Sequence, residues 1–185
     1  MGLVIGITGS FGAGKGCVAD YLVRKKGFKH FSARSFITEE IKKRGLPVDR
    51  DSMTVVANDL RQRHGPSYIL EQLVDQAKEF GGDAVVESIR AVAEARYVKS
   101  QGGYVLGVDA DPKVRYERTH KRGSETDNVS FEKWRKQELN ESNPDDPTKQ
   151  DIFGALRESD VIISNTKTLN ELHEQIDTFL TSISS

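Results

Sequence analysis

Short apolar stretches alternate with longer amphipathic ones along the chain. The apolar stretches are rich in β-branched residues and lack a two-residue alternation, which is typical of strands buried on both faces of a parallel sheet. Five strands are predicted, at residues 3–8, 28–31, 84–87, 104–109 and 161–164. Helices are predicted near residues 15–26, 35–44, 52–63, 67–79, 90–100, 112–122, 130–141, 148–158 and 168–181. The pattern predicts an α/β fold, a five-stranded parallel sheet with helices on both faces.

Local signals support several boundaries. Asp111 precedes Pro112, the order expected of an N-cap and the first helical residue. Thr168 is followed three residues later by Glu171, the spacing of a capping box. Two polar stretches, residues 122–128 and 141–150, interrupt the pattern and are interpreted as exposed connections.

Composition narrows the classes of partner. The 185 residues carry a formal net charge of −1, with 27 basic residues spread along the chain, whereas a protein that neutralises many nucleic-acid phosphates is usually more basic. No apolar run reaches the ~18–20 residues needed to span a bilayer. The single cysteine permits no internal disulfide and suggests a reducing compartment. We therefore expect no nucleic acid and no membrane as partners, and a cytoplasmic location.

A phosphate-loop motif joins the first predicted strand to the first predicted helix. The stretch Gly9-Ser10-Phe11-Gly12-Ala13-Gly14-Lys15-Gly16 fits G-x-x-x-x-G-K at every position. Its glycines allow backbone N–H groups to turn toward the β- and γ-phosphates of ATP, and Lys15 supplies a positive charge for the transferred phosphoryl group. The alternative is a glycine-rich turn without a nucleotide, but the strand before it and the helix after it favour nucleotide binding.

Two residues depart from the full motif. Gly16 stands where Ser or Thr usually ligates Mg²⁺, so either the site is degenerate or the metal is held through water and carboxylates. The form G-x-x-G-x-G-K-G resembles that of adenylate kinases and their relatives, which lack this hydroxyl. Cys17 stands where those enzymes usually carry Thr, a contact to the α-phosphate. A buried small apolar residue is the interpretation we favour for Cys17.

Nearly the whole chain resembles small nucleotide kinases. His30-Phe31-Ser32 and the helix after it are similar to the segment after the second strand of nucleoside monophosphate kinases. The chain also resembles a family of nucleotide-kinase-like proteins, some fused to deoxycytidylate deaminase domains. The residues that carry this second resemblance are Arg50, Asn58, Leu60, Arg61, Gly65, Pro66, the run Glu87-Ser88-Ile89-Arg90, and the last strand ending in Asn165. Dephospho-CoA kinases share the same core. The resemblance implies a P-loop kinase fold and a deaminase-type partner.

The candidate residues for binding the phosphoryl acceptor are Ser32, Arg34, Arg61 and Arg90. Adenylate kinases place an arginine in the helix after the second strand, and Thr38 occupies that register here, which argues against AMP as the acceptor. Arg90 could clamp an acceptor phosphate with two hydrogen bonds. A solvated arginine in the first turn of the next helix is the alternative, disfavoured because a cation fits poorly at a helix N-terminus.

Glu87 ends the third predicted strand, at the carboxyl edge where α/β sheets bind ligands. There its carboxylate could hold Mg²⁺ through water or accept the proton of an acceptor hydroxyl. An ordinary helix cap is the alternative. Together with Lys15, Glu87 is a catalytic candidate.

Three arginines recur along one predicted helix face, Arg115, Arg118 and Arg122. The arrangement resembles the lid of nucleotide kinases, where arginines close over the phosphates. We expect one domain over residues 1–185 with a lid at about residues 115–150, and we take Arg118 and Arg122 as catalytic candidates. A solvated charged face is the alternative.

The remaining candidates are weaker. Asn165 begins the loop after the last strand and could frame the adenine of ATP, with a turn residue as the alternative. The four histidines show no metal-ligand spacing and are interpreted as structural or surface residues. Trp134 is expected to pack the helix after the lid.

The leading hypothesis is an ATP- and Mg²⁺-dependent kinase whose acceptor is a small nucleotide, a nucleoside monophosphate or its deoxy form. Dephospho-CoA kinase is the alternative within the same enzyme class. A nucleotide-binding regulatory module with little turnover is the alternative of another class, and Gly16 and Cys17 keep it open.

Overall fold

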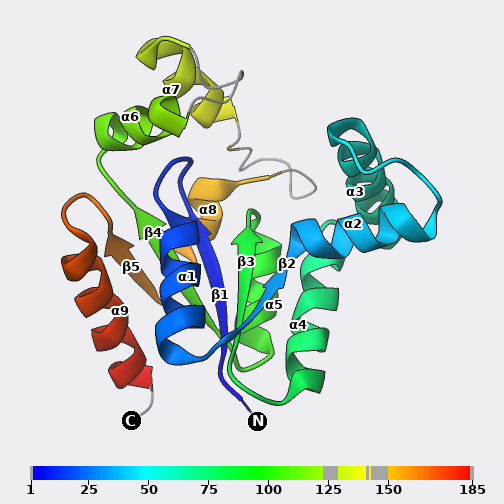
Figure 1. Cartoon of the computed structure of the whole chain (residues 1–185), viewed down its shortest axis with the longest axis horizontal. Helices are drawn as coiled ribbons and strands as arrows, with labels where there is room; N and C mark the ends of the chain where they lie inside the picture. Colours follow the sequence, from blue (N-terminus) through cyan, green and yellow to red (C-terminus); the bar gives the residue numbers. More distant parts are fainter. Residues whose placement is uncertain (1, 123–128, 141, 143–149, 184–185) are drawn as a thin grey trace.

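The computed structural model describes residues 2–122, 129–140, 142 and 150–183. Within these ranges, five strands form one sheet in the order β2-β3-β1-β4-β5 (Figure 1). The strands are β1 (Val4–Gly9), β2 (Lys29–Ser32), β3 (Ala84–Ile89), β4 (Tyr104–Asp109) and β5 (Val161–Ser164). All neighbouring strands are parallel. The predicted five-stranded parallel sheet is confirmed.

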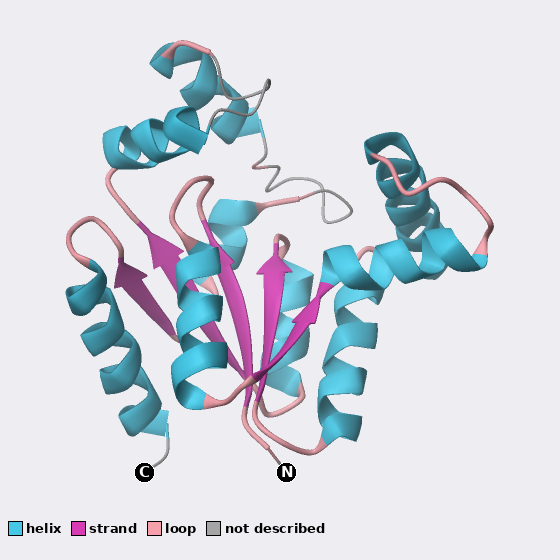
Figure 2. Cartoon of the chain, in the orientation of Figure 1, coloured by secondary structure: helices cyan, strands magenta, loops and turns pink. Residues whose placement is uncertain are grey.

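Helices cover both faces of this sheet (Figure 2). They are α1 (Lys15–Lys26), α2 (Ala33–Lys43), α3 (Arg50–His64), α4 (Tyr68–Phe80), α5 (Val92–Ser100), α6 (Pro112–Arg122), α7 (Phe131–Asn140), α8 (Ile152–Arg157) and α9 (Leu169–Ile183). Helices α1 and α9 pack on one face, and α4, α5 and α8 pack on the other. No helix in the described part of the chain is both long and apolar enough to cross a membrane.

The central strand β1 shows why the sequence lacks a two-residue alternation. Ile5 and Ile7 belong to the apolar cluster under α1 and α9. Val4 belongs to the cluster under α4 and α5 on the opposite face. Because both faces of β1 are covered, all six of its residues are buried, and every position favours an apolar or small side chain.

Two helix pairs extend beyond the carboxyl ends of the strands, α2 with α3 on one side and α6 with α7 on the other (Figure 1). The first pair has its own small core, which includes Ile37, Ile41, Val56 and Leu60. The two pairs flank the carboxyl ends of β1 and β3. Ligands of α/β proteins bind at this end of the sheet.

Both predicted caps are confirmed. Asp111 Oδ1 accepts a hydrogen bond of 2.9 Å from the N–H of Lys113. Thr168 Oγ1 accepts from the N–H of Glu171 at 3.2 Å, and Glu171 Oε2 accepts from the N–H of Thr168 at 3.0 Å. These contacts satisfy N–H groups at the two helix starts that have no partner within the helix.

Several expected boundaries differ from the structure, two of them at helix starts. Helix α5 has Ala91 as its N-cap, so Arg90 precedes the helix and the predicted helix start at residue 90 is wrong. Helix α8 is shorter than expected because Asp151 caps it, accepting from the N–H of Gly154 at 2.9 Å. Most of the two polar connections, 123–128, 141 and 143–149, lies outside the described residues.

Candidate active site

The phosphate loop leaves the end of β1 and enters α1, as the motif predicts. Gly12 and Gly14 have φ angles of 77° and 94°, in the left-handed region that favours glycine. A Cβ on Gly14 would lie 2.2 Å from Nδ2 of Asn165, and a Cβ on Gly9 would lie 2.2 Å from the carbonyl oxygen of Val108. These glycines therefore allow both the loop conformation and the close approach of neighbouring segments.

Lys15 folds back over the start of the loop. Its Nζ donates to the carbonyl oxygens of Gly9, at 2.8 Å, and Ser10, at 3.2 Å. The hydroxyl of Ser10 is buried and has no hydrogen-bond partner among the described residues. Buried hydroxyls usually have a partner, so this one fits a ligand oxygen. The loop therefore carries the donors that a phosphate group requires.

Asn165 contacts the loop from outside. Its side chain is buried, and Nδ2 donates to the carbonyl oxygen of Ala13 at 2.8 Å. Its own carbonyl oxygen accepts from Nη1 of Arg118 at 2.7 Å. The side-chain amide of Asn165 thus bonds the backbone of the phosphate loop, and Arg118 bonds the backbone carbonyl of Asn165.

Arg115 is buried rather than directed into open space. Its Nη1 donates to the carbonyl oxygen of Phe11 at 3.1 Å, its Nε donates to Ala110 O at 2.9 Å, and its guanidinium pairs with the buried carboxylate of Glu138. The three lid arginines are therefore not equivalent. Arg122 is the last residue of α6, and its side chain lies outside the described part of the structure.

Trp134 packs helix α7 as expected and also contacts the phosphate loop. Its indole is buried, with ring centroids 6.3 Å from Phe11, 5.9 Å from Tyr116 and 6.0 Å from Phe131. The guanidinium of Arg115 lies 5.3 Å from the indole centroid, within cation–π distance. This aromatic group joins α6 and α7 to residue 11 of the loop.

Glu87 lies within β3, not at its end. The register pairs Ile7 with Glu87 and Thr8 with Ile89, so Ser88 is an extra residue in a bulge. Ser88 has a φ angle of 80°, and no other non-glycine residue in the described part of the chain has a positive φ. The prediction that the strand ends at Glu87 is therefore wrong, because the strand continues through the bulge to Ile89.

The carboxylate of Glu87 has a partner that the sequence did not reveal. Nε2 of His30, on the neighbouring strand β2, lies 3.5 Å from Glu87 Oε2. The hydrogen bond with His30 and the nearby charges of His30 and Lys15 hold the pKa of Glu87 below its ordinary value. The same contact raises the pKa of His30. The interpretation of His30 as a structural or surface residue did not include this contact.

The described residues contain no group of three or more His, Cys, Asp or Glu side chains that could hold a metal ion. Glu87 of β3 pairs in register with Ile7 of β1, the strand that leads into the phosphate loop. A Cβ on Gly16 would meet no atom within 4 Å. Cys17 is exposed, so the expectation that it is buried is wrong. Its place in the first turn of α1 turns the thiol away from the core.

A cavity of about 670 Å³ opens between α2, α3 and the end of β3. Its lining brings together three arginines from separate parts of the chain, Arg34, Arg61 and Arg90. Apolar side chains and the polar groups of Thr38, Asn58 and Gln150 complete it. Ser32 is instead the last residue of β2 and the N-cap of α2.

The charges of this cavity are unbalanced. Among the described residues that line it, three arginines face one carboxylate, Asp49. Asp49 already accepts a hydrogen bond of 2.8 Å from the N–H of Ser52 as the N-cap of α3. The described ion pairs include none of the three guanidinium groups, but the charges of Arg61 and Arg90 partly oppose the rise that burial causes in the pKa of Glu94. The cavity therefore suits an anionic ligand.

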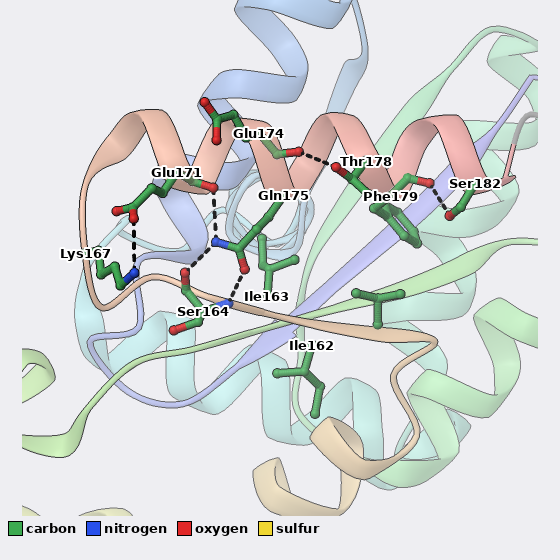
Figure 3. A pocket seen from close by; sticks show the side chains of 11 residues that line it. Ile162, Ile163, Ser164, Lys167, Glu171, Glu174, Gln175, Thr178, Phe179 and Ser182 are labelled. Carbon is green, nitrogen blue, oxygen red and sulfur yellow. Dashed lines mark hydrogen bonds and ion pairs between the residues drawn. The ribbon is translucent and has the colours of Figure 1, made fainter.

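A second cavity, of about 620 Å³, lies at the far edge of the sheet between β5 and α9 (Figure 3). Gln175 of α9 bonds both backbone groups of Ser164, with Oε1 accepting from N–H at 2.9 Å and Nε2 donating to the carbonyl at 2.9 Å. The amide thus closes one end of the exposed strand edge. The lining of this cavity combines apolar side chains with polar ones, and its charged residues are two glutamates and one lysine. The cavity therefore does not share the cationic character of the first.

Comparison with known proteins places this site in a family. A family model described as an AAA domain matches residues 5–142. A UPF0200 protein of Methanocaldococcus jannaschii is 30% identical over 98% of this chain and 90% of its own length. The chain belongs to the AAA domain and UPF0200 families. A UPF0200 protein of Pyrococcus horikoshii is 27% identical over 99% of this chain and 98% of its own.

Solved structures similar to this UPF0200 chain show the P-loop kinase fold. Shikimate kinase from Acinetobacter baumannii, in complex with shikimate, has a TM-score of 0.62 and 16% identity over 98% of this chain and 94% of its own. Dephospho-CoA kinase from Campylobacter jejuni has a TM-score of 0.60 and 15% identity over 100% and 98% of the two chains. The resemblance to P-loop kinases is thus confirmed at the level of the fold.

Three residues that were not selected from the sequence lie near the phosphate loop or the arginine-lined cavity of this UPF0200 chain. His30 is found only when β2 and β3 are known to be neighbours. Asn58 stands in the resemblance pattern and lines the arginine cavity, so that pattern could have revealed it. Glu138 gave no signal, because a charged helix residue is normally solvated.

Proposed function

We propose that this protein is an ATP-dependent phosphotransferase with a small nucleotide-like acceptor, and that the acceptor is a nucleoside monophosphate or its deoxy form. The observation that carries the proposal is the cavity lined by Arg34, Arg61 and Arg90, which reaches the end of β3, the strand paired with the end of β1 from which the phosphate loop leaves. Ser88 and Arg90, which line the cavity, lie one and three residues after Glu87 in the chain. The charge of Lys15 contributes to the lowered pKa of Glu87, so Glu87 lies near the phosphate loop. An anionic acceptor in this cavity would thus lie beside the donor site.

The residues present fit a nucleoside triphosphate. The glycine loop, the buried hydroxyl of Ser10 and the ammonium of Lys15 provide donors for phosphate oxygens. When bound, ATP with Mg²⁺ supplies the γ-phosphoryl group and charge neutralisation. Residues 9–17 would hold its phosphates, and Glu87 would hold the metal through water.

The side chains of the chain have separate roles in this proposal. Lys15 stabilises the negative charge that develops on the transferred group. Glu87 is kept ionised by His30, so its carboxylate stays available to hold the metal ion through water or to take a proton. Arg34, Arg61 and Arg90 hold the acceptor phosphate in the cavity.

The α6–α7 pair carries the remaining roles. Arg118 donates through Nη1 to the carbonyl of Asn165 at 2.7 Å, beside the phosphate loop, and is retained as a catalytic candidate. Arg122, at the end of α6, is retained as a catalytic candidate of the lid. Placement in the cytoplasm and a deaminase-type partner are further parts of the proposal, supported by composition and resemblance.

The proposal is tested by measuring ADP release from ATP with Mg²⁺ across a panel of acceptors. The panel contains the ribose and deoxyribose monophosphates of each base, dephospho-CoA and shikimate. We expect turnover with one or more monophosphates and none with Lys15→Ala. Turnover with dephospho-CoA alone would establish the alternative kinase. Tight nucleotide binding without turnover on any acceptor would establish a binding module instead.

A further inference from the structure

We infer that Asn165 and Arg115 are positioning residues that preset the phosphate loop for an oxyanion by holding two of its carbonyl groups outward. The inference rests on the proposed function in that the loop is taken to bind a nucleotide. It assigns Asn165 a different role from framing adenine. It also assigns Arg115 a different role from touching the ligand.

The two contacts fall on alternate peptides of the loop. Arg115 Nη1 donates to the carbonyl oxygen of Phe11 at 3.1 Å, and Asn165 Nδ2 donates to the carbonyl oxygen of Ala13 at 2.8 Å. Every described peptide bond is trans, and in a trans peptide the C=O and the following N–H point in opposite directions. Fixing these carbonyls therefore turns the N–H groups of Gly12 and Gly14 away from the two side chains.

Those two N–H groups are not used within the described chain. The N–H of Ala13, which lies between them, donates to the carbonyl of Ser10 at 3.2 Å. The N–H groups of Gly12 and Gly14 have no described acceptor. Because backbone N–H groups normally find partners, two N–H groups held in a fixed direction form an anion site of the kind that successive loop amides provide.

Both side chains are themselves held by tertiary contacts. The N–H of Asn165 donates to the carbonyl of Asp109 at 2.7 Å, and its carbonyl accepts from Arg118. Arg115 is fixed by the carbonyl of Ala110 and by the carboxylate of Glu138. The supports thus come from the ends of β4 and β5, the strands on one side of β1. A loop held in this way loses little conformational freedom when a phosphate binds.

The position of Asn165 also separates this role from adenine recognition. Its side chain is 4% exposed, and Nδ2 already bonds Ala13. A Cβ on Gly14 would collide with that nitrogen at 2.2 Å. The amide therefore fills the space beside the loop. Its loss should weaken binding of the phosphates, whether or not adenosine is attached to them.

The test compares two ligands, ATP and inorganic tripolyphosphate, each with Mg²⁺, by titration calorimetry. The variant is Asn165→Ala, and the matched control is Asn170→Ala, an exposed asparagine in the first turn of α9. We expect Asn165→Ala to weaken both ligands by the same factor, about fivefold to tenfold, the size of one lost hydrogen bond. The control should bind both ligands as the wild type does.

Weaker ATP binding with unchanged tripolyphosphate binding would overturn the inference and assign Asn165 to the adenosine part. Unchanged binding of both ligands, or no tripolyphosphate binding by the wild type, would also overturn it. If Asn165→Ala does not fold, Asn165→Ser removes the contact with Ala13 but keeps a polar group, and the same outcomes apply. Normal binding without phosphoryl transfer would contradict the proposed function alone.

Discussion

The imidazole of His30 lies 3.5 Å from the carboxylate of Glu87, across the neighbouring parallel strands β2 and β3. The pair places a titratable cation next to the carboxylate that could hold Mg²⁺ through water. The side chains of His30 and Glu87 are 36% and 26% exposed, so the pair is accessible to solvent protons. Its charge state therefore follows the pH of the solution.

This pair should stabilise the fold only in a defined pH window. The pKa of His30 is raised above its ordinary 6.5, so its contribution is complete below pH 6.5 and is lost as the pH rises through the raised value. The pKa of Glu87 is lowered from 4.5, so its contribution is complete above pH 4.5 and is lost in stronger acid. The pair contributes fully between these two values.

His30→Gln tests this window through thermal unfolding. We expect the difference in Tm between the wild type and His30→Gln to be larger at about pH 5.5 than at about pH 8.5. His64→Gln is the control, because His64 stacks on Tyr68 instead. A difference in Tm that is the same at both pH values would contradict the ion pair.

Lys15→Ala should reduce turnover by about two to three orders of magnitude, because the ammonium stabilises charge that develops in the transition state. The fold should be retained, since Lys15 lies outside the apolar clusters and its Nζ donates to the carbonyl oxygens of Gly9 and Ser10. The measurement is kcat with the acceptor found active in the panel. Lys25→Ala, an exposed lysine of the same helix, should behave as the wild type. Near-normal kcat in Lys15→Ala would remove Lys15 from the mechanism.

Arg61→Ala should raise the KM for the acceptor by roughly tenfold to a hundredfold, the effect of losing a hydrogen bond to a charged group. The KM for ATP should stay unchanged, because Arg61 lines the cavity between α2 and α3. Arg63→Ala is the matched control, since Arg63 lies two residues further on α3 and pairs with Asp59. An effect on ATP with none on the acceptor would reverse the assignment of the cavity.

Gly16→Ser should fold normally, because a Cβ at this position meets no atom within 4 Å. We expect the wild type to require Mg²⁺ and to be active without a hydroxyl at residue 16, since Mg²⁺ retains several water ligands. Steady-state rates with and without Mg²⁺ in both proteins provide the measurement. A wild type that is inert, combined with an active Gly16→Ser, would mean that the natural site is degenerate.

Glu138→Leu should lower the free energy of unfolding by roughly 3–5 kcal/mol, because it removes the buried carboxylate that pairs with the guanidinium of Arg115 and leaves the more exposed Asp109, 3.4 Å from Nε, as a carboxylate partner. The side chains of Arg115 and Glu138 are 3% and 4% exposed. Denaturant unfolding, followed by the fluorescence of the neighbouring Trp134, provides the measurement. Glu132→Leu, at an exposed position of the same helix, should change stability little. Equal effects of the two substitutions would contradict a special role for the buried pair.

Much of the fold could be predicted because its signals are local. The phosphate loop is recognised from its glycines and from the strand and helix around it, and Asp111 and Thr168 mark helix starts by their own side chains. The bulge at Ser88 could not be predicted, because it depends on how β3 aligns with β1. The predicted start of α5 at residue 90 is too early for a similar reason. The bulge lengthens β3 to Ile89, so Arg90 connects the strand to the N-cap Ala91.

The sequence by itself determined the parallel sheet and the position of the phosphate loop, because hydrophobic periodicity and glycine spacing act over a few residues. Only the tertiary structure decided which side chains surround the loop. The order of the strands places His30 beside Glu87, and the connections after β4 and β5 bring Arg115 and Asn165 to the carbonyls of the loop. Asn165 and Ala13 are 152 residues apart. A contact between residues so distant depends on the packing of the whole sheet, which local pattern does not encode.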